Sequence, residues 1–133
     1  YDNLAKLSYK SLTVVVDACF SGTSDRGTLM PQASLVRVKS SKGVLKDPKA
    51  MIFTSASGTQ IASWYPEQSH SLFTYYFLKG LQGAANTDRN RSLSLEEMQT
   101  YLQQQVPYQA RRMKNRNQTP EVYGQSDNVL LSY

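Results

Sequence analysis

The chain of 133 residues has little of several things: one cysteine, one histidine, one tryptophan, and no apolar run long enough to cross a bilayer. A single cysteine excludes an internal disulfide framework and most structural zinc sites, which need several thiolates. No basic-then-apolar secretory leader opens the chain, so we predict a cytoplasmic protein with no membrane association. The length and the 40% content of hydrophobic residues correspond to one domain with a core.

The net charge of +5 is concentrated in two basic clusters, residues 37–49 and residues 111–116. Nucleic-acid binding would need such side chains on one face, with aromatic residues between them to stack the bases. Both segments instead have the composition of loops and contain no aromatic residue. We interpret them as solvated loops, and keep a basic nucleic-acid-binding module as one alternative for the function.

The most informative segment is Asp17-Ala18-Cys19-Phe20-Ser21-Gly22, which directly follows the apolar run at residues 12–16. The β-branched residues of that run predict a strand over residues 11–17 that is buried on both faces, as in a parallel sheet. Open α/β sheets place their reactive groups at the carboxyl ends of such strands. Cys19 is therefore either a nucleophile or a plain buried thiol, and Asp17 is either a specificity group or an acceptor of backbone hydrogen bonds.

The remaining pattern predicts an α/β fold. Residues 50–55 read as a second strand, residues 71–82 as an apolar helix that packs deeply, and residues 129–131 as a last strand. A second helix begins at Ser94, because Ser94 and Glu97 form a capping box. Its core stripe comprises Leu95, Met98, Leu102 and Val106. Only three strands are visible, so the chain supplies about half of a doubly wound sheet, which normally has about five or six strands.

Residues 14–22 resemble the nucleophile segment of the caspase-like cysteine peptidases, closest to metacaspases and bacterial orthocaspase-type enzymes, which carry Asp-x-Cys-x-Ser-Gly there. The resemblance continues in order through residues 53–57, 62–64, 70–74, 94–97 and 118–120. It implies the three-layer α/β/α caspase-hemoglobinase fold, with residues 1–133 as the C-terminal part of one peptidase domain. The nucleophile strand would lie in residues 1–36, a cleavable basic loop in residues 37–49, and a part similar to the caspase small subunit in residues 50–133.

The same resemblance assigns roles to individual residues. It implies Cys19 as the nucleophile of a Cys–His dyad, and Asp17 as part of an S1 pocket for a P1 arginine or lysine. A carboxylate in a narrow pocket would bind a basic side chain through charge-assisted hydrogen bonds and repel an acidic one. Ser55 and Ser63 are candidates for the pocket wall and substrate contacts; Trp64 is either a wall near S2 or a core residue. If S1 is acidic, the self-cleavage candidates in the basic loop are Arg37, Lys39, Lys42 and Lys46.

The sequence contains no segment that resembles the one carrying the catalytic base of the family. In the family it is a histidine followed by glycine, before the cysteine, whereas the one histidine here is His70, which precedes Ser71 at a helix start. We therefore expect the His-bearing N-terminal portion of the same domain as a partner on a separate polypeptide, together with a peptide or protein substrate. A catalytically inactive caspase-like scaffold in a signalling or defence assembly is the other alternative.

No metal or organic cofactor is required by this chemistry. Calcium dependence is common in metacaspases, and residues 88–92 superficially resemble a calcium loop. That segment has Leu93 where the loop needs glycine and Gln99 where it needs a bidentate glutamate. We interpret it as a polar turn before the capped helix.

Overall fold

The computed structural model describes residues 6–17, 23–24, 27–28, 47–57 and 60–133. Its main sheet has three strands in the order β1 (Leu12–Val16), β4 (Ala50–Thr54) and β8 (Glu121–Tyr123). β1 and β4 are parallel, whereas β8 runs antiparallel to β4. The first two predicted strands are thus confirmed, and their carboxyl ends lie at the same end of the sheet.

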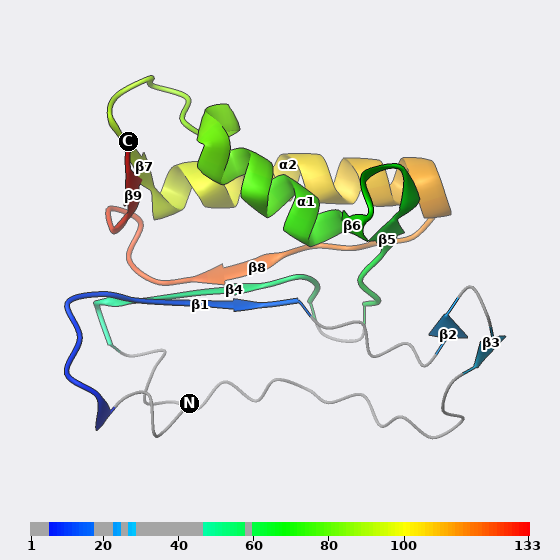
Figure 1. The fold of residues 1–133 in the computed structure, drawn as a ribbon, viewed down its shortest axis with the longest axis horizontal. Coiled ribbons are helices and arrows are strands. Elements are labelled where there is room, and N and C mark those ends of the chain that lie inside the picture. Colours follow the sequence, from blue (N-terminus) through cyan, green and yellow to red (C-terminus); the bar gives the residue numbers. More distant parts are fainter. Residues whose placement is uncertain (1–5, 18–22, 25–26, 29–46, 58–59) are drawn as a thin grey trace.

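Two helices, α1 (Leu72–Lys79) and α2 (Leu95–Lys114), lie on the same side of this sheet (Figure 1). α1 continues into a π-helical turn, Gly80–Ala84, in which Gly83 has a φ of 107°. Glycine tolerates that angle, and this explains why the helical segment ends there, as predicted. The capping box of α2 is also confirmed: the Ser94 hydroxyl accepts from the Glu97 N–H at 3.2 Å, and the Glu97 carboxylate accepts from the Ser94 N–H at 3.0 Å.

The main core lies between the helices and one face of β4. Phe53 of β4 meets Phe77 of α1 edge to face, with ring centroids 5.1 Å apart. The whole predicted stripe of α2 is buried, and the cluster also takes in Met51, Leu72, Phe73 and Leu93. Alternate residues of β4 point the other way, where Ala50 and Ile52 pack against Leu12 and Val14 of β1.

The prediction that β1 is buried on both faces is wrong for the chain as described. Thr13 and Val15 are exposed, Val15 by 43%. In the described part of the chain β1 pairs only with β4, so it is an edge strand, and its outer hydrogen-bonding edge has no neighbour there. The apolar residues of β1 therefore lie at a border of the sheet, which is an unusual place for a strand of this composition.

The predicted last strand forms, but not in the main sheet. It is β9 (Val129–Ser132), which pairs antiparallel with β7 (Ser92–Ser94) beside the start of α2. The third strand of the main sheet, β8, has only three residues and no apolar run, so the sequence pattern missed it. Two further two-stranded pairs are β2 (Thr23–Ser24) with β3 (Gly27–Thr28), and β5 (Trp64–Tyr65) with β6 (His70–Ser71).

One other expectation needs correction. α2 extends to Lys114, so Arg111, Arg112 and Lys114 belong to a helix rather than to a loop. Cations suit the last turn of a helix, because its free carbonyl groups carry partial negative charge. The prediction that α1 packs deeply is confirmed, because Leu72 and Phe73 are 0% exposed, while Leu78 on the outer face is 42% exposed. None of the helices in the described ranges has the length and apolarity needed to cross a membrane.

Candidate active site at the carboxyl end of β1

Asp17 follows β1 directly, and its side chain lies at the amino-terminal end of α1. Its Oδ2 atom accepts hydrogen bonds from the Ser71 hydroxyl and, at 2.5 Å, from the Thr74 hydroxyl. Ser71 is the N-cap of α1, and its Oγ also accepts from the Thr74 N–H at 3.1 Å. The first turn of a helix has free N–H groups and partial positive charge, so a carboxylate is well placed there.

The predicted nucleophile, Cys19, lies outside the described residues, as do the self-cleavage candidates Arg37, Lys39, Lys42 and Lys46. Asp17 is two positions before Cys19, and its side chain is exposed. Its neighbour on β1, Val16, accepts a hydrogen bond at 3.0 Å from the Ser55 N–H, at the end of β4. The carboxyl ends of β1 and β4 are therefore joined by a hydrogen bond next to Asp17.

A single buried glutamine connects the other predicted site residues. The Gln118 side chain is 0% exposed; its Oε1 accepts from the Ser63 N–H at 2.8 Å, and its Nε2 donates to the Ser55 carbonyl at 2.9 Å. The Ser63 carbonyl in turn accepts from the Leu72 N–H at 2.8 Å, in the first turn of α1. Gln118 thus ties the end of β4 to the segment that leads into β5 and α1.

A family model for the caspase domain matches residues 1–130, nearly the whole chain. The chain belongs to the caspase-domain family. This family consists of cysteine peptidases. A search of curated proteins and a search of solved structures gave no match.

Within this caspase domain, three of the predicted substrate-binding residues differ in exposure. Ser55 and Ser63 are 4% and 3% exposed, and the Ser63 Oγ has no hydrogen-bond partner in the described part of the chain. Trp64 is 50% exposed and lies opposite Ser71 across the β5–β6 pair. The core alternative for Trp64 is therefore wrong, and its place beside the partner of Asp17 fits a wall of the site. The substrate roles of all three residues stay predictions.

His70 lies in a short strand, and residues 88–92 form a polar turn, as predicted. His70 is exposed on β6, opposite Tyr65. In the polar turn, the Asp88 carboxylate accepts from the Asn90 N–H at 2.9 Å, and the Asn90 Oδ1 accepts from the Ser92 N–H at 2.6 Å. Among the described residues no three His, Cys, Asp or Glu side chains gather as a metal site would require.

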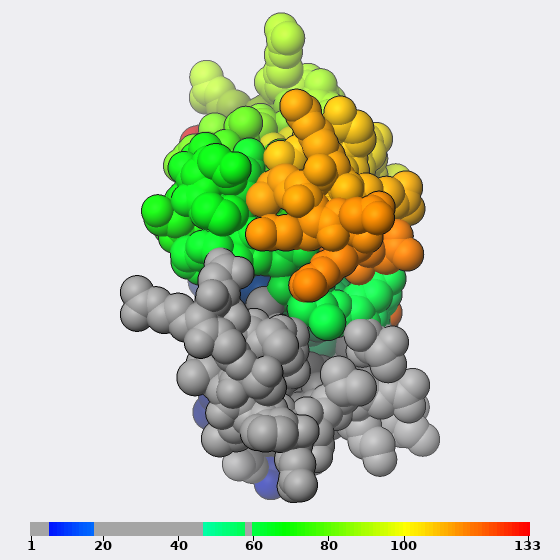
Figure 2. Space-filling view, turned by 90° about the vertical axis from the view of Figure 1, so that its right-hand side faces the viewer, coloured from blue at the N-terminus to red at the C-terminus, as the bar shows by residue number. Residues whose placement is uncertain are grey.

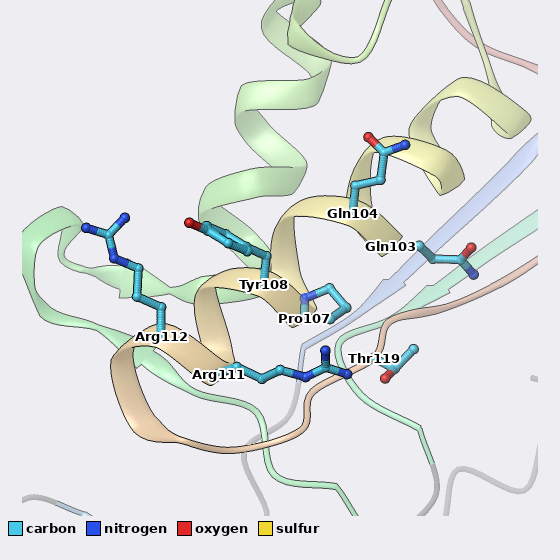
Figure 3. Close-up of a pocket in the computed structure, with 7 residues that line it drawn as sticks. All are labelled: Gln103, Gln104, Pro107, Tyr108, Arg111, Arg112 and Thr119. Atoms are coloured by element: carbon cyan, nitrogen blue, oxygen red, sulfur yellow. The ribbon is translucent and has the colours of Figure 1, made fainter.

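One cavity in the described part of the chain, of about 690 Å³, lies elsewhere, at the carboxyl-terminal half of α2. Its lining consists of Gln103, Gln104, Pro107, Tyr108, Arg111, Arg112 and Thr119. Figure 3 shows Arg111 extending toward Thr119, while Arg112 points away from it. Figure 2 shows this end of α2 beside the surface of α1, and none of the lining residues is a predicted site residue.

Proposed function

We propose that this chain is the nucleophile-bearing part of a metacaspase- or orthocaspase-type cysteine endopeptidase that cleaves after arginine or lysine. The observation that carries the proposal is the Asp17 carboxylate, exposed at the carboxyl end of β1 and anchored on α1, two residues before Cys19. An exposed, fixed carboxylate attracts a P1 guanidinium or ammonium group and repels a P1 carboxylate. Family membership supplies the peptidase chemistry.

In the proposed reaction the catalytic histidine first takes the proton of the Cys19 thiol. The resulting thiolate attacks the carbonyl carbon of the scissile bond, and a carbon–sulfur bond forms. The carbonyl oxygen becomes an oxyanion, held by the Cys19 N–H and by a glycine amide beside the catalytic histidine. That histidine donates a proton to the leaving amine as the carbon–nitrogen bond breaks. Water then hydrolyses the acyl-enzyme and releases the thiol.

The histidine would come from a partner segment that adds its strand to β1. β1 has a free outer edge in the described part of the chain, and Val15 on it is 43% exposed. A parallel strand with so many β-branched residues is normally covered on both faces and paired on both edges. A parallel strand from the His-bearing half would pair with the free backbone N–H and carbonyl groups on the outer edge of β1. Its own carboxyl end would then lie beside that of β1.

The experiment that tests the catalytic assignment is covalent labelling of the thiol. The full-length protein is incubated with a peptidyl acyloxymethyl ketone that has arginine at P1, with a P1 aspartate reagent as its matched control. Mass spectrometry of the tryptic peptides is expected to find the arginine reagent on Cys19 and no adduct from the aspartate reagent. Labelling elsewhere, or equal labelling by both reagents, would refute the assignment.

Self-cleavage in the basic loop is a further part of the proposal. Arg37, Lys39, Lys42 and Lys46 would satisfy the same S1 pocket, so the active enzyme is expected to carry a cut after one of them. Intact-mass measurement of the active protein, beside a Cys19→Ala variant, gives the position of the cut. An active enzyme with this loop uncut would remove this part of the proposal.

A further inference from the structure

The two hydroxyl groups that bind Asp17 both reach the same carboxylate oxygen. Ser71 Oγ and Thr74 Oγ1 donate to Oδ2, and neither donates to Oδ1. A carboxylate oxygen has two lone-pair sites, so these two donors saturate Oδ2. Oδ1 is then the oxygen that a ligand can use.

We propose that Ser71 and Thr74 are positioning residues that make Asp17 bind the P1 cation through one oxygen. This inference rests on the proposed function, because it concerns the S1 pocket of the same peptidase. A guanidinium group gains from a carboxylate mainly when both oxygens accept in parallel, whereas a lysine ammonium group needs one oxygen only. With Oδ2 occupied, arginine loses that advantage, and the pocket accepts lysine about as well as arginine.

The hydroxyl groups are carried by a rigid part of the fold. Ser71 is the N-cap of α1 and also pairs with Trp64 across the β5–β6 ladder. Leu72 and Phe73, which follow it, are both 0% exposed in the core. Thr74 is β-branched, so its χ1 angle has few alternatives in a helix. The donors therefore keep their direction when a substrate enters, as a specificity device requires.

The same two hydrogen bonds could instead have a role in stability alone. The hydroxyls would then only fasten the end of β1 to α1, across 54 and 57 residues of sequence. Loss of one hydroxyl would lower stability, and activity on every substrate, without changing the choice between arginine and lysine. The two readings therefore differ in the ratio of two substrates measured on one protein.

The test uses the full-length protein with two peptides that differ only in a P1 arginine or lysine. The variants are Thr74→Val, which keeps the shape and removes the donor, and Thr74→Ser, which restores it. Thr100→Val, on the exposed side of α2, is the matched control. The parent enzyme and the control are expected to cleave both peptides with kcat/KM values within about fivefold of each other, since neither P1 residue gains a second carboxylate contact.

Thr74→Val frees a lone pair of Oδ2 for the guanidinium group. The arginine-to-lysine ratio is expected to rise by about fivefold to tenfold, mainly because KM falls for arginine and changes little for lysine. Thr74→Ser is expected to return the ratio to the parent value. An unchanged ratio in Thr74→Val, or the same high ratio in Thr74→Ser, would overturn the positioning role.

A binding measurement separates this inference from the peptidase proposal. NMR titration of the Cys19→Ala protein with N-acetyl-arginine amide and N-acetyl-lysine amide reports the pocket without the reaction. Suppose that the protein cleaves neither peptide but binds both amides, and that Thr74→Val shifts the binding preference toward arginine. This result would refute the peptidase activity and support the positioning role of Thr74. Cleavage after both residues with a ratio insensitive to Thr74 would keep the peptidase and refute the positioning role. Neither cleavage nor binding would overturn both.

Discussion

Gln118 offers the sharpest structural test of how this caspase domain holds its site together. Its amide group lies in the interior and bridges the Ser63 N–H and the Ser55 carbonyl at 2.8 and 2.9 Å. Leucine has a similar volume, so Gln118→Leu keeps the space filled and removes both hydrogen bonds. Two buried backbone groups are then left without these partners.

The expected magnitude follows from the cost of orphaned polar groups. A buried donor or acceptor that loses its partner costs about 1–3 kcal/mol, so two of them give about 2–6 kcal/mol. That loss is a large share of the total stability of a typical domain, which is about 5–15 kcal/mol. Gln118→Leu should therefore lower the free energy of unfolding far more than an ordinary surface substitution does.

The assay is urea unfolding of the full-length protein, followed by circular dichroism, with Gln103→Leu on the exposed face of α2 as the matched control. The control is expected to change the free energy of unfolding by less than about 0.5 kcal/mol. Hydrogen exchange at the Ser63 amide should also accelerate in Gln118→Leu. A loss smaller than about 1 kcal/mol, with the Ser63 amide still protected, would mean that the bridge does not hold the segment.

The remaining predictions concern local features of the fold. Ser94→Ala removes the N-cap of α2 and should cost about 1 kcal/mol in urea unfolding. The hydrogen bond from the Ser94 N–H holds the pKa of Glu97 below its ordinary value of 4.5. Its stabilising contribution is therefore present above that pH and lost as the pH falls through the lower folded-state pKa, so Glu97→Gln should flatten the acid limb of a stability profile. Gly124, at a φ of 144°, would place a Cβ 2.9 Å from the Ala50 carbonyl oxygen, so Gly124→Ala should cost about 2–4 kcal/mol in thermal unfolding. Gly83→Ala, with a φ of 107° and open space, should cost about 1–2 kcal/mol, and equal losses at both glycines would contradict the packing argument.

Elements governed by local patterns could be predicted from the sequence. The apolar runs predicted both ends of β1 and of β4 to within one residue. The spacing of Ser94 and Glu97 predicted the start of α2. β8 could not be predicted in this way, because its three residues become a strand only through pairing with β4. The exposure of Val15 likewise depends on which strands lie beside β1, and a pattern of β-branched residues does not contain that information.

The residues of the candidate site also differ in whether a local sequence pattern could identify them. Asp17 and Cys19 were singled out by their place behind an apolar strand, and Ser55, Ser63 and Trp64 by the family resemblance. Ser71 and Thr74 were not assigned to the site, since their hydrogen bonds to Asp17 span more than fifty residues. An N-cap serine before an apolar helix is a local signal for Ser71, but no local signal shows that a strand end meets that cap.

The central claim is that Cys19 and Asp17 form an arginine- and lysine-directed peptidase site, and peptide cleavage tests it most directly. The measurement is kcat/KM of the full-length protein on matched fluorogenic peptides ending in arginine, lysine or aspartate, with Cys19→Ala as control. We predict turnover of the arginine and lysine peptides, none of the aspartate peptide, and none of any peptide by Cys19→Ala. Turnover of the aspartate peptide would contradict the role of Asp17. No turnover with the His-bearing half present would contradict the peptidase itself and favour a caspase-like scaffold.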